Sequence, residues 1–297
     1  MVSKHIIVTG ANGQLGMEFR ELSTKSIHKF TFLTSSDLDI SNRTAVVDYF
    51  NDQPIDVVLN CAAYTKVDLA ESEKTKAYDV NANGVKNLLD AMSDECVMIH
   101  YSTDYVYQAK SGTPIKESET THPANIYAAS KLAGDEKVID SDKKAIVIRT
   151  SWVYSTYGNN FVKTMLRLAD KLPELKVVND QIGSPTYAKD LATASLHILA
   201  KLIEIANNSK FNRVYHYSNT GQISWYDFAK EIFSQANKDI PLHAILTSEY
   251  PTPASRPSWS VLDCGLVKKT FDVDIVNWKE SLRDCINQLS KTSTPYQ

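Results

Sequence analysis

Short apolar runs rich in β-branched residues alternate with amphipathic stretches through the first half of this chain. The apolar runs read HIIVTG, FTFLTS, PIDVVLNCA, CVMIHYST and AIVIRTSWV, and helical spacing follows in QLGMEFRELS, NLLDAM and NIYAASKLAGDEKVI. Strands that are apolar on both faces and alternate with helices form parallel sheets covered on both sides. The sequence therefore predicts an α/β protein with a doubly wound parallel sheet of Rossmann type, whose dinucleotide-binding core is residues 1–155.

The alternation loosens after about residue 155. Apolar spacing predicts helices at 161–172, 187–206, 224–235 and 277–289, and short strands at 176–180 and 214–219. Ser224 is the expected N-cap of the third helix. Residues 156–297 should form mainly a smaller substrate-binding lobe against the carboxyl ends of the strands, with some segments returning to the Rossmann core. No linker rich in Gly or Ser separates the two parts, so we expect them to be tightly joined.

Composition excludes several classes of protein. The 297 residues, 43% of them hydrophobic, suffice for one large or two closely joined domains, and the net charge of -3 gives no basic surface for nucleic acid. The chain enters a strand pattern without a signal peptide and has no run of about 18 apolar residues, so we expect a cytoplasmic protein without a membrane partner. The four cysteines lack C-x-x-C spacing and the histidines are scattered, which favours reduced structural thiols and no metal site.

A glycine turn joins the first strand to the first helix. Gly10, Gly13 and Gly16 have the spacing G-x-x-G-x-x-G. Small residues here let the backbone approach a pyrophosphate, whose charge is favoured by the free N–H groups of a helix N-terminus. A strand-to-helix turn without a ligand is the alternative, but the position at the first βα junction favours a dinucleotide.

The second strand bears on which nicotinamide cofactor is used. It ends in Thr34-Ser35-Ser36 and not in the acid that accepts hydrogen bonds from a ribose 2'-hydroxyl. NADPH is therefore permitted beside NADH, although no arginine stands there to demand it. Asp39 and Ile40 follow, and we expect Asp39 to accept a hydrogen bond from the adenine amine and Ile40 to pack on its ring. A surface loop acid is the alternative for Asp39.

Tyr127 and Lys131 stand four residues apart, so a helix places them on one face. A phenol has a pKa near about 10, and an adjacent ammonium favours its ionised form. Tyr127 would donate a proton to a ketone oxygen as hydride arrives from the nicotinamide. Lys131 would lower the phenol pKa and bind the nicotinamide ribose. The same spacing also occurs by chance on exposed helix faces.

Two strand ends strengthen this interpretation. Thr103 ends a predicted strand and places a hydroxyl at the carboxyl edge of the sheet, and Ala62-Ala63-Tyr64 ends the preceding strand, where it could pass beneath the dinucleotide. A strand-end hydroxyl, a dinucleotide turn and a Tyr-Lys helix together indicate a reductase.

Motifs over nearly the whole chain carry a family resemblance. They are GANGQLG, NCAAYTKVDLAE, STDYVY, IYAASKLAGDE, RTSWVY, GNNFVKTML, NDQIGSPTYAKDLA, SWYDFAKEI and RPSWSVLD. The chain resembles the extended short-chain dehydrogenases and, within them, the family of dTDP-4-dehydrorhamnose reductases. The resemblance implies an NAD(P)H-dependent oxidoreductase that reduces the C4 keto group of dTDP-4-dehydro-β-L-rhamnose to dTDP-β-L-rhamnose, the last step in making that sugar donor.

The resemblance also implies roles for particular residues. It makes Tyr127 the proton donor, Lys131 its partner and Thr103 the hydroxyl that orients the substrate. The implied cofactor contacts, together with the glycine turn, are Gly10, Asn12, Gly13, Gln14, Leu15, Gly16, Asp39, Ile40, Ala62, Ala63, Tyr64, Tyr127 and Lys131. The implied sugar-nucleotide contacts are Thr103, Asp104 and Trp152.

Two of the expected substrate residues have a physical basis of their own. Trp152 follows a strand, where an indole could wall the sugar pocket and offer one N–H donor; a core aromatic is the alternative. Arg256 precedes Pro257, and a guanidinium can pair with the substrate diphosphate; a surface arginine is the alternative. The chain departs from the family in having Tyr107-Gln108-Ala109 for Phe-Asp-Gly, beside the substrate, and Ala128 for glycine.

Two other functions remain open. An epimerase or dehydratase on the same scaffold is one, but a dehydratase uses an acidic pair after the strand-end threonine, and here only Asp104 follows Thr103 before Tyr105. A regulatory subunit that binds the dinucleotide without chemistry is the other, and the intact Tyr127 and Lys131 argue against it. The sequence leaves open the nucleotide base, the preferred cofactor, bound magnesium and the oligomeric state, for which a homodimer is the candidate.

Overall fold

The computed structural model describes residues 3–109, 112–205 and 213–291. Its main sheet has six strands in the order β10-β5-β4-β3-β1-β2, and every neighbouring pair is parallel. The strands are β1 (His5–Thr9), β2 (Lys29–Leu33), β3 (Val57–Asn60), β4 (Val97–Thr103), β5 (Lys144–Thr150) and β10 (Arg213–His216). The prediction of a doubly wound parallel sheet is confirmed. The strand order reverses between β1 and β3, and ligands of such sheets bind beyond the carboxyl ends of the strands at this point.

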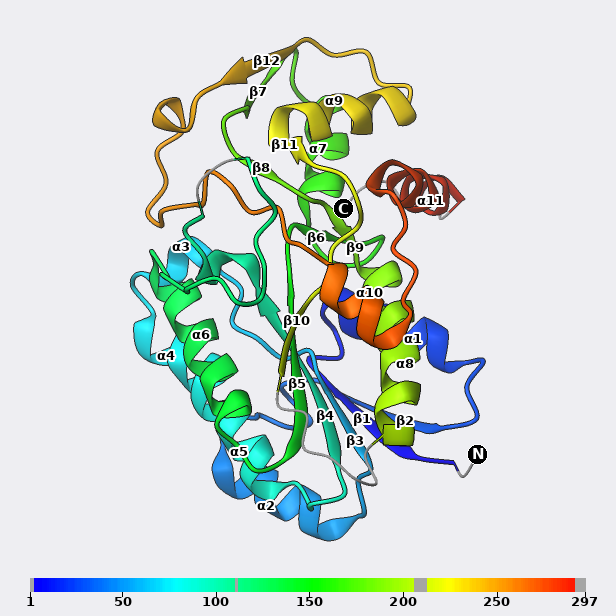
Figure 1. Ribbon diagram of the computed structural model, residues 1–297. Helices are drawn as coiled ribbons and strands as arrows, with labels where there is room; N and C mark the ends of the chain where they lie inside the picture. The colour runs from blue at the N-terminus through cyan, green and yellow to red at the C-terminus, as the bar shows by residue number, and fades with distance from the viewer. Residues whose placement is uncertain (1–2, 110–111, 206–212, 292–297) are drawn as a thin grey trace.

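Helices cover both faces of the sheet (Figure 1). One face carries α1 (Gln14–Ser23), α8 (Ala188–Ile205) and α10 (Gly265–Phe271), and the other carries α2 (Arg43–Asp52), α5 (Gly84–Ala91) and α6 (Ile126–Ile139). Successive strand residues point to opposite faces. Ile6 and Val8 therefore pack on the first face while Ile7 packs on the second, which is why these strands are apolar throughout.

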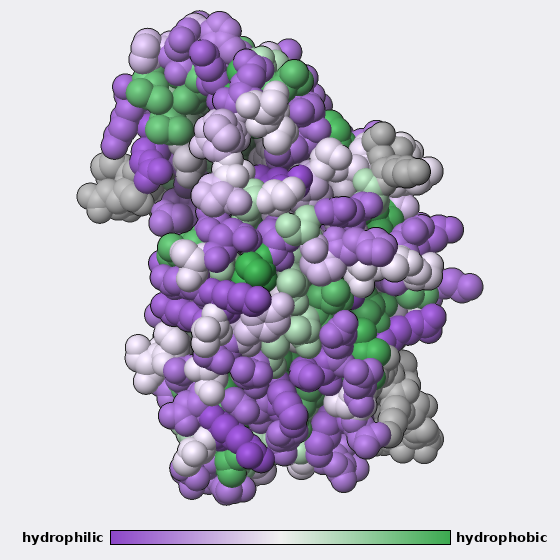
Figure 2. Space-filling view, turned by 90° about the vertical axis from the view of Figure 1, so that its left-hand side faces the viewer, coloured by the Kyte–Doolittle hydropathy of each residue, from purple (hydrophilic) through white to green (hydrophobic). Residues whose placement is uncertain are grey.

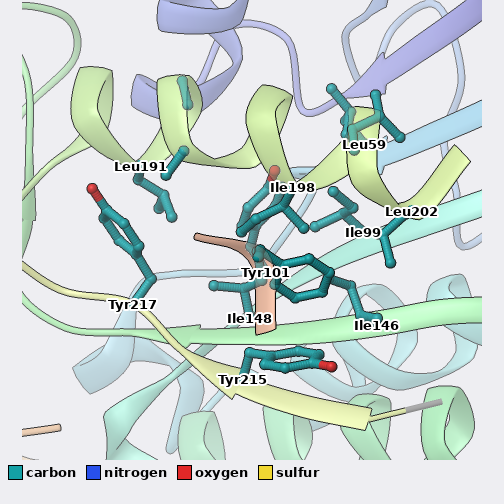
Figure 3. Close-up of a cluster of buried hydrophobic side chains, with 14 of the residues drawn as sticks. Leu59, Ile99, Tyr101, Ile146, Ile148, Leu191, Ile198, Leu202, Tyr215 and Tyr217 are labelled. Atoms are coloured by element: carbon teal, nitrogen blue, oxygen red, sulfur yellow. The ribbon is translucent and has the colours of Figure 1, made fainter. Parts of the chain in front are cut away.

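The first face is filled largely by α8. Figure 3 shows Leu191, Ile198 and Leu202 of this helix above side chains of the sheet. The sheet side chains in that view are Leu59, Ile99, Tyr101, Ile146, Ile148 and Tyr215. Both α8 and β10 follow residue 156 in the sequence, yet they belong to the core of the main sheet.

A second lobe lies beyond the carboxyl ends of the strands (Figure 1). Its helices are α7 (Phe161–Ala169), α9 (Trp225–Gln235) and α11 (Trp278–Lys291). Its paired strands are β6 (Val153–Tyr154) with β9 (Thr186–Tyr187), β7 (Leu175–Val178) with β12 (Leu242–Ile245), and β8 (Ile182–Gly183) with β11 (Ile223–Ser224). A separate apolar core from these helices and strands supports the lobe.

Short helical turns complete the secondary structure. They are α3 (Val67–Ala70), α4 (Lys74–Tyr78), the π-helical η1 (Asp79–Asn83), and the 3-10 turns η2 (Asp104–Val106) and η3 (Thr247–Glu249). Figure 2 shows that the left-hand face of Figure 1 is mostly hydrophilic, with apolar side chains in small groups. Within the described ranges, no helix is long and apolar enough to cross a membrane.

Most predicted elements are observed. α1 has the predicted bounds, and Ser224 caps α9 by accepting a hydrogen bond from the backbone N–H of Asp227 at 3.0 Å. The helix predicted for 187–206 runs from Ala188 to Ile205, and residue 206 lies outside the described residues. Helix α2 was not predicted, because its Val and Thr residues favour strands. The Asn42 N-cap and the buried Val46 stabilise the helix there.

Candidate active site

A cavity of about 840 Å³ lies along the carboxyl ends of the strands, where the two lobes meet. This volume falls within the range of small-molecule pockets. Its lining includes nearly every residue that the sequence singled out: Gly10, Asn12, Gly13, Gln14, Leu15, Gly16, Asp39, Ile40, Ala62, Ala63, Tyr64, Thr103, Asp104, Tyr127, Lys131 and Trp152. Arg256 does not line it. The sequence-predicted site thus comes together in one place, with one exception.

The glycine turn has the geometry of a phosphate cradle. Gly10 has a φ of +63°, and a Cβ there would lie 2.6 Å from the carbonyl oxygen of Cys61. The N–H of Gly13 donates to the Gly10 carbonyl at 2.9 Å, and α1 begins immediately afterwards without a side-chain cap. The first N–H groups of α1 are therefore not used by a capping side chain, which suits an anion. These residues fit a dinucleotide pyrophosphate.

The turn after β2 contains an acid, Asp37, that was not singled out from the sequence. The backbone N–H and the hydroxyl of Thr34 both donate to Asp37, at 2.9 and 2.7 Å. These hydrogen bonds lower the pKa of Asp37, which therefore carries a negative charge next to Thr34 of the cavity lining, although Asp37 does not itself line the cavity. The spacing of three residues between Thr34 and Asp37 is the signal that a turn analysis could have used.

The expected adenine residues, Asp39 and Ile40, lie in the loop just before α2. Ile40 is buried against Gly84, where an added Cβ would lie 2.7 Å from Ile40 Cγ1. Asp39 is exposed and accepts from the backbone N–H and the hydroxyl of Ser41, at 3.0 and 2.7 Å. Asp39 therefore stabilises the turn that contains it and also lines the cavity.

Helix α6 brings the Tyr-Lys pair to the cavity. Its N-cap Asn125 accepts from the backbone N–H of Ala128 at 2.7 Å, which fixes the start of the helix. Lys131 is 2% exposed, its Nζ donates to the carbonyl of Tyr101 at 2.7 Å, and it lies 3.5 Å from Nε2 of His100. Burial lowers the pKa of Lys131 to about 8, although the nearby Asp135 carboxylate opposes this.

Tyr127 differs from the sequence expectation. Burial raises its pKa to about 12, a hydrogen bond with the Thr103 hydroxyl lowers it, and the carboxylates of Asp104 and Asp135 raise it further. This direction is opposite to the one expected from Lys131, because burial outweighs any effect of the ammonium. A phenol with a raised pKa stays protonated and keeps the proton that a general acid must donate.

Thr103 and Asp104 form a buried hydroxyl-carboxyl pair beside Tyr127. The Thr103 hydroxyl donates to Asp104 Oδ1 at 3.0 Å and accepts from the N–H of Tyr105 at 3.2 Å. Burial raises the pKa of Asp104 to about 7, and hydrogen bonds with Ser260 and Thr103 oppose this. Only one carboxyl group stands at this strand end, as the sequence indicates.

An aromatic pair forms the wall on the side of the second lobe. Trp152 and Trp225 both line the cavity and stack with ring centroids 3.5 Å apart and an interplanar angle of 8°. The sequence analysis did not single out Trp225. Its signal was its place directly after the expected N-cap Ser224, which puts it at the first position of α9.

Arg256 is held elsewhere. Its guanidinium donates to the two carboxylate oxygens of Asp68 at 3.1 and 2.7 Å and to the carbonyl of Ala254 at 2.9 Å. The prediction that Arg256 faces the substrate pocket is not met in this structure, because Asp68 on α3 offers a bidentate partner. The charge of Arg256 still acts on the neighbouring Tyr105, which lines the cavity.

A parallel sheet with a glycine turn at its first βα junction, a strand-end threonine and a Tyr-Lys helix defines the class of extended short-chain dehydrogenases. Within that class, the family described as RmlD substrate binding domain matches residues 4–291, and the chain belongs to this family.

Individual relatives match this chain over nearly their full lengths. The chain is 39% identical over 283 residues to a dTDP-4-dehydrorhamnose reductase of Sinorhizobium fredii, covering 94% of this chain and 95% of the relative. A crystal structure of a dTDP-4-dehydrorhamnose reductase from Clostridium acetobutylicum has a TM-score of 0.89 at 39% identity, covering 96% of this chain and 99% of that one. A Bacillus anthracis structure in complex with NADP has a TM-score of 0.89 at 38% identity, covering 97% and 100%.

Proposed function

We propose that this protein reduces the C4 keto group of dTDP-4-dehydro-β-L-rhamnose to give dTDP-β-L-rhamnose, the last step in making that sugar donor. The observation that carries the proposal is the single cavity that joins the glycine turn to Thr103, Tyr127 and Lys131. Relatives that match the chain over nearly its whole length are dTDP-4-dehydrorhamnose reductases. The protein is thus an NAD(P)H-dependent oxidoreductase.

The residues of the cavity can carry out the proton side of a ketone reduction. When bound, the nicotinamide cofactor supplies the hydride to C4. Tyr127 donates its phenolic proton to the C4 oxygen as negative charge develops there, and its raised pKa keeps that proton available until then. We assign the Thr103 hydroxyl to hold the substrate oxygen near the phenol, which requires its single proton to turn from Asp104, 3.0 Å away, to that oxygen.

Lys131 serves the cofactor side of the same site. Its ammonium is anchored by the Tyr101 carbonyl, and we assign its remaining donors to the hydroxyls of the nicotinamide ribose. When the cofactor is bound, the glycine turn would hold the pyrophosphate, Asp39 and Ile40 would contact the adenine, and Ala62-Ala63-Tyr64 would contact the dinucleotide from the cavity wall. Residues 1–155 thus provide the cofactor site, and residues 156–297 provide mainly the substrate lobe.

Both NADPH and NADH are proposed as cofactors. The Bacillus anthracis relative is described in complex with NADP, and the exposed Ser35 of the cavity lining offers a hydroxyl where a 2'-phosphate would lie. Asp37 stands close to the same place, and its negative charge favours a ribose without that phosphate. The balance between the hydroxyl and the carboxylate sets the preference between NADPH and NADH.

The oligomeric state and the cellular compartment are proposed from general properties of proteins. We propose a homodimer, because closed two-fold dimers are the commonest soluble oligomers, and light scattering after size exclusion measures the mass directly. We also propose that the protein works in the cytoplasm, where its four free cysteines stay reduced.

The test of the reaction is cofactor oxidation, followed by absorbance with and without the sugar nucleotide. Oxidation of one NADPH per substrate, with dTDP-rhamnose as product, is expected. A dehydratase or epimerase would convert the sugar without net oxidation of cofactor, and a regulatory subunit would bind NADPH without consuming it. Either result would replace the proposed reaction.

A further inference from the structure

Trp152 is held in a backbone conformation that bulky residues avoid. Its φ is +47°, in the left-handed region, which is costly for a side chain of this size unless the surroundings impose it. The surroundings here are the two short strands that follow. The Trp152 carbonyl accepts from the N–H of Thr186 at 3.2 Å, and Val153 pairs with the same residue in the β6–β9 ladder. The conformation directs the indole into the cavity.

A glycine makes room for this indole. A Cβ added to Gly183 would lie 2.5 Å from Cε2 and 2.7 Å from Cζ2 of Trp152. Gly183 lies in β8 and pairs with Ile223 of β11, two residues before Trp225. The same small ladder therefore provides the space for one indole and positions the other.

Trp225 completes the support of Trp152. The two rings are nearly parallel, with centroids 3.5 Å apart, and Phe161 packs against Trp225 with centroids 4.6 Å apart. The Ser224 N-cap fixes the start of α9 and so the position of Trp225. Strained backbone, reserved space and aromatic support all act on one side chain, the indole of Trp152.

We propose that Trp225 is a positioning residue, which holds Trp152 as a flat wall against which the sugar ring of the substrate lies. This rests on the proposed function. A 6-deoxyhexose has an apolar face of C–H groups and a methyl group, and a rigid indole can bury that face at small entropic cost. Reduction at C4 requires the sugar to stay in one orientation between Tyr127 and the nicotinamide, and small displacements there reduce the rate strongly.

The stack can be detected before any kinetics are measured. Two stacked indoles at this separation couple electronically, and where their long axes are rotated against each other within the stack they give a paired positive and negative band in circular dichroism. The chain has four tryptophans, and Trp259, which donates to the Thr113 carbonyl at 2.8 Å outside the cavity lining, provides the matched control. Trp225→Phe and Trp152→Phe should each abolish the paired band, and Trp259→Phe should retain it. If the paired band remained in Trp225→Phe, it would not come from the Trp152–Trp225 stack, and the proposal would be refuted.

Kinetics separate positioning from folding. Trp225→Ala should raise the substrate KM about tenfold and lower kcat, since an aromatic stack of this kind is worth up to about that factor, while the Kd for NADPH stays unchanged. Trp225→Phe should recover most of both, because a ring still supports Trp152. Gly183→Ala, which presses on the indole from the ladder, should resemble Trp225→Ala.

Thermal unfolding of each variant identifies those that fold. If Trp225→Ala does not fold, Trp225→Leu keeps apolar volume without a flat ring and carries the same expectation. A folded Ala or Leu variant with KM and kcat within about twofold of the native values would overturn the proposal. Failure of the native protein to oxidise NADPH with the sugar nucleotide would instead refute the proposed reaction, so the two failures are distinguishable.

Discussion

Lys131 places a positive charge in an almost fully buried position. Its pKa of about 8 lies well below the ordinary lysine value of about 10.4, and the gap corresponds to roughly 3 kcal/mol of unfavourable free energy for the charged form. Lys131→Met removes that cost and also the hydrogen bond to the Tyr101 carbonyl, which offsets about 1 kcal/mol. We therefore expect the ligand-free variant to be about 2 kcal/mol more stable than the native protein near neutral pH.

The gain should depend on pH with a defined sign. Below about pH 8 the lysine is charged in the folded and unfolded states, so the native protein bears the full cost. As pH rises from about 8 to about 10.4, the folded protein releases the proton before the unfolded chain does, and native stability rises. The advantage of Lys131→Met should therefore shrink across this window and be small above it.

The groups around Lys131 leave this sign unchanged. Burial lowers the pKa of His100 well below its ordinary value, so His100 is neutral throughout. Asp135 retains its ion pair with Arg149 at 2.9 Å when Lys131 is absent. Cys61 is half-buried, and because desolvation raises its pKa it is neutral over this window.

Urea unfolding of both proteins near pH 7 and near pH 10 measures the effect. Lys86→Met is the matched control, because Lys86 is 54% exposed and pairs with Asp90 on the surface, where such pairs contribute about 0–1 kcal/mol. Turnover and NADPH affinity of Lys131→Met should fall although the protein is more stable. A variant that is less stable than the native protein near pH 7, or whose gain does not decline with pH, would refute the reasoning.

Three further predictions concern the cavity. Tyr127→Phe should lower kcat by at least about 10²-fold, the scale of general acid catalysis, with NADPH affinity unchanged; near-normal kcat would exclude Tyr127 as the proton donor. Thr34→Asp should lower kcat/KM for NADPH relative to NADH by repelling the 2'-phosphate, and an unchanged ratio would show that β2 does not contact that ribose. Arg256→Ala should leave the Kd for the sugar nucleotide unchanged, because Arg256 is paired with Asp68 and does not line the cavity. A weakened Kd in this variant would show that Arg256 reaches the substrate in spite of that ion pair.

The parts of the fold that could be predicted depend on local chemistry. Continuous apolar runs follow from a sheet buried on both faces, and the bounds of α1 follow from the glycine turn before it. The lining residues Gly10, Thr103, Tyr127 and Lys131 were found because each stands at a strand end, a turn or a helical spacing that the sequence displays. Each of these signals spans fewer residues than a single βα unit.

The parts that could not be predicted depend on contacts between distant segments. Arg256 meets Asp68 across 188 residues, and no local pattern distinguishes that partner from a diphosphate. Trp225 meets Trp152 through the packing of the second lobe, where β8 pairs with β11. The direction of the Tyr127 pKa shift was not predicted, because the four-residue spacing to Lys131 shows proximity along a helix but not how strongly burial acts on the phenol.

The side chain of Gln14 links a local sequence signal, the glycine turn, to distant residues of the second lobe. Gln14 belongs to the glycine turn, yet its side-chain Oε1 accepts from Asn160 at 2.9 Å and its Nε2 donates to the carbonyl of Val153 at 3.4 Å. Asn160 is the N-cap of α7, and Val153 directly follows Trp152. The residue that opens the cofactor helix therefore also holds the start of the substrate wall. These two hydrogen bonds tie the glycine turn directly to β6 and to the start of α7.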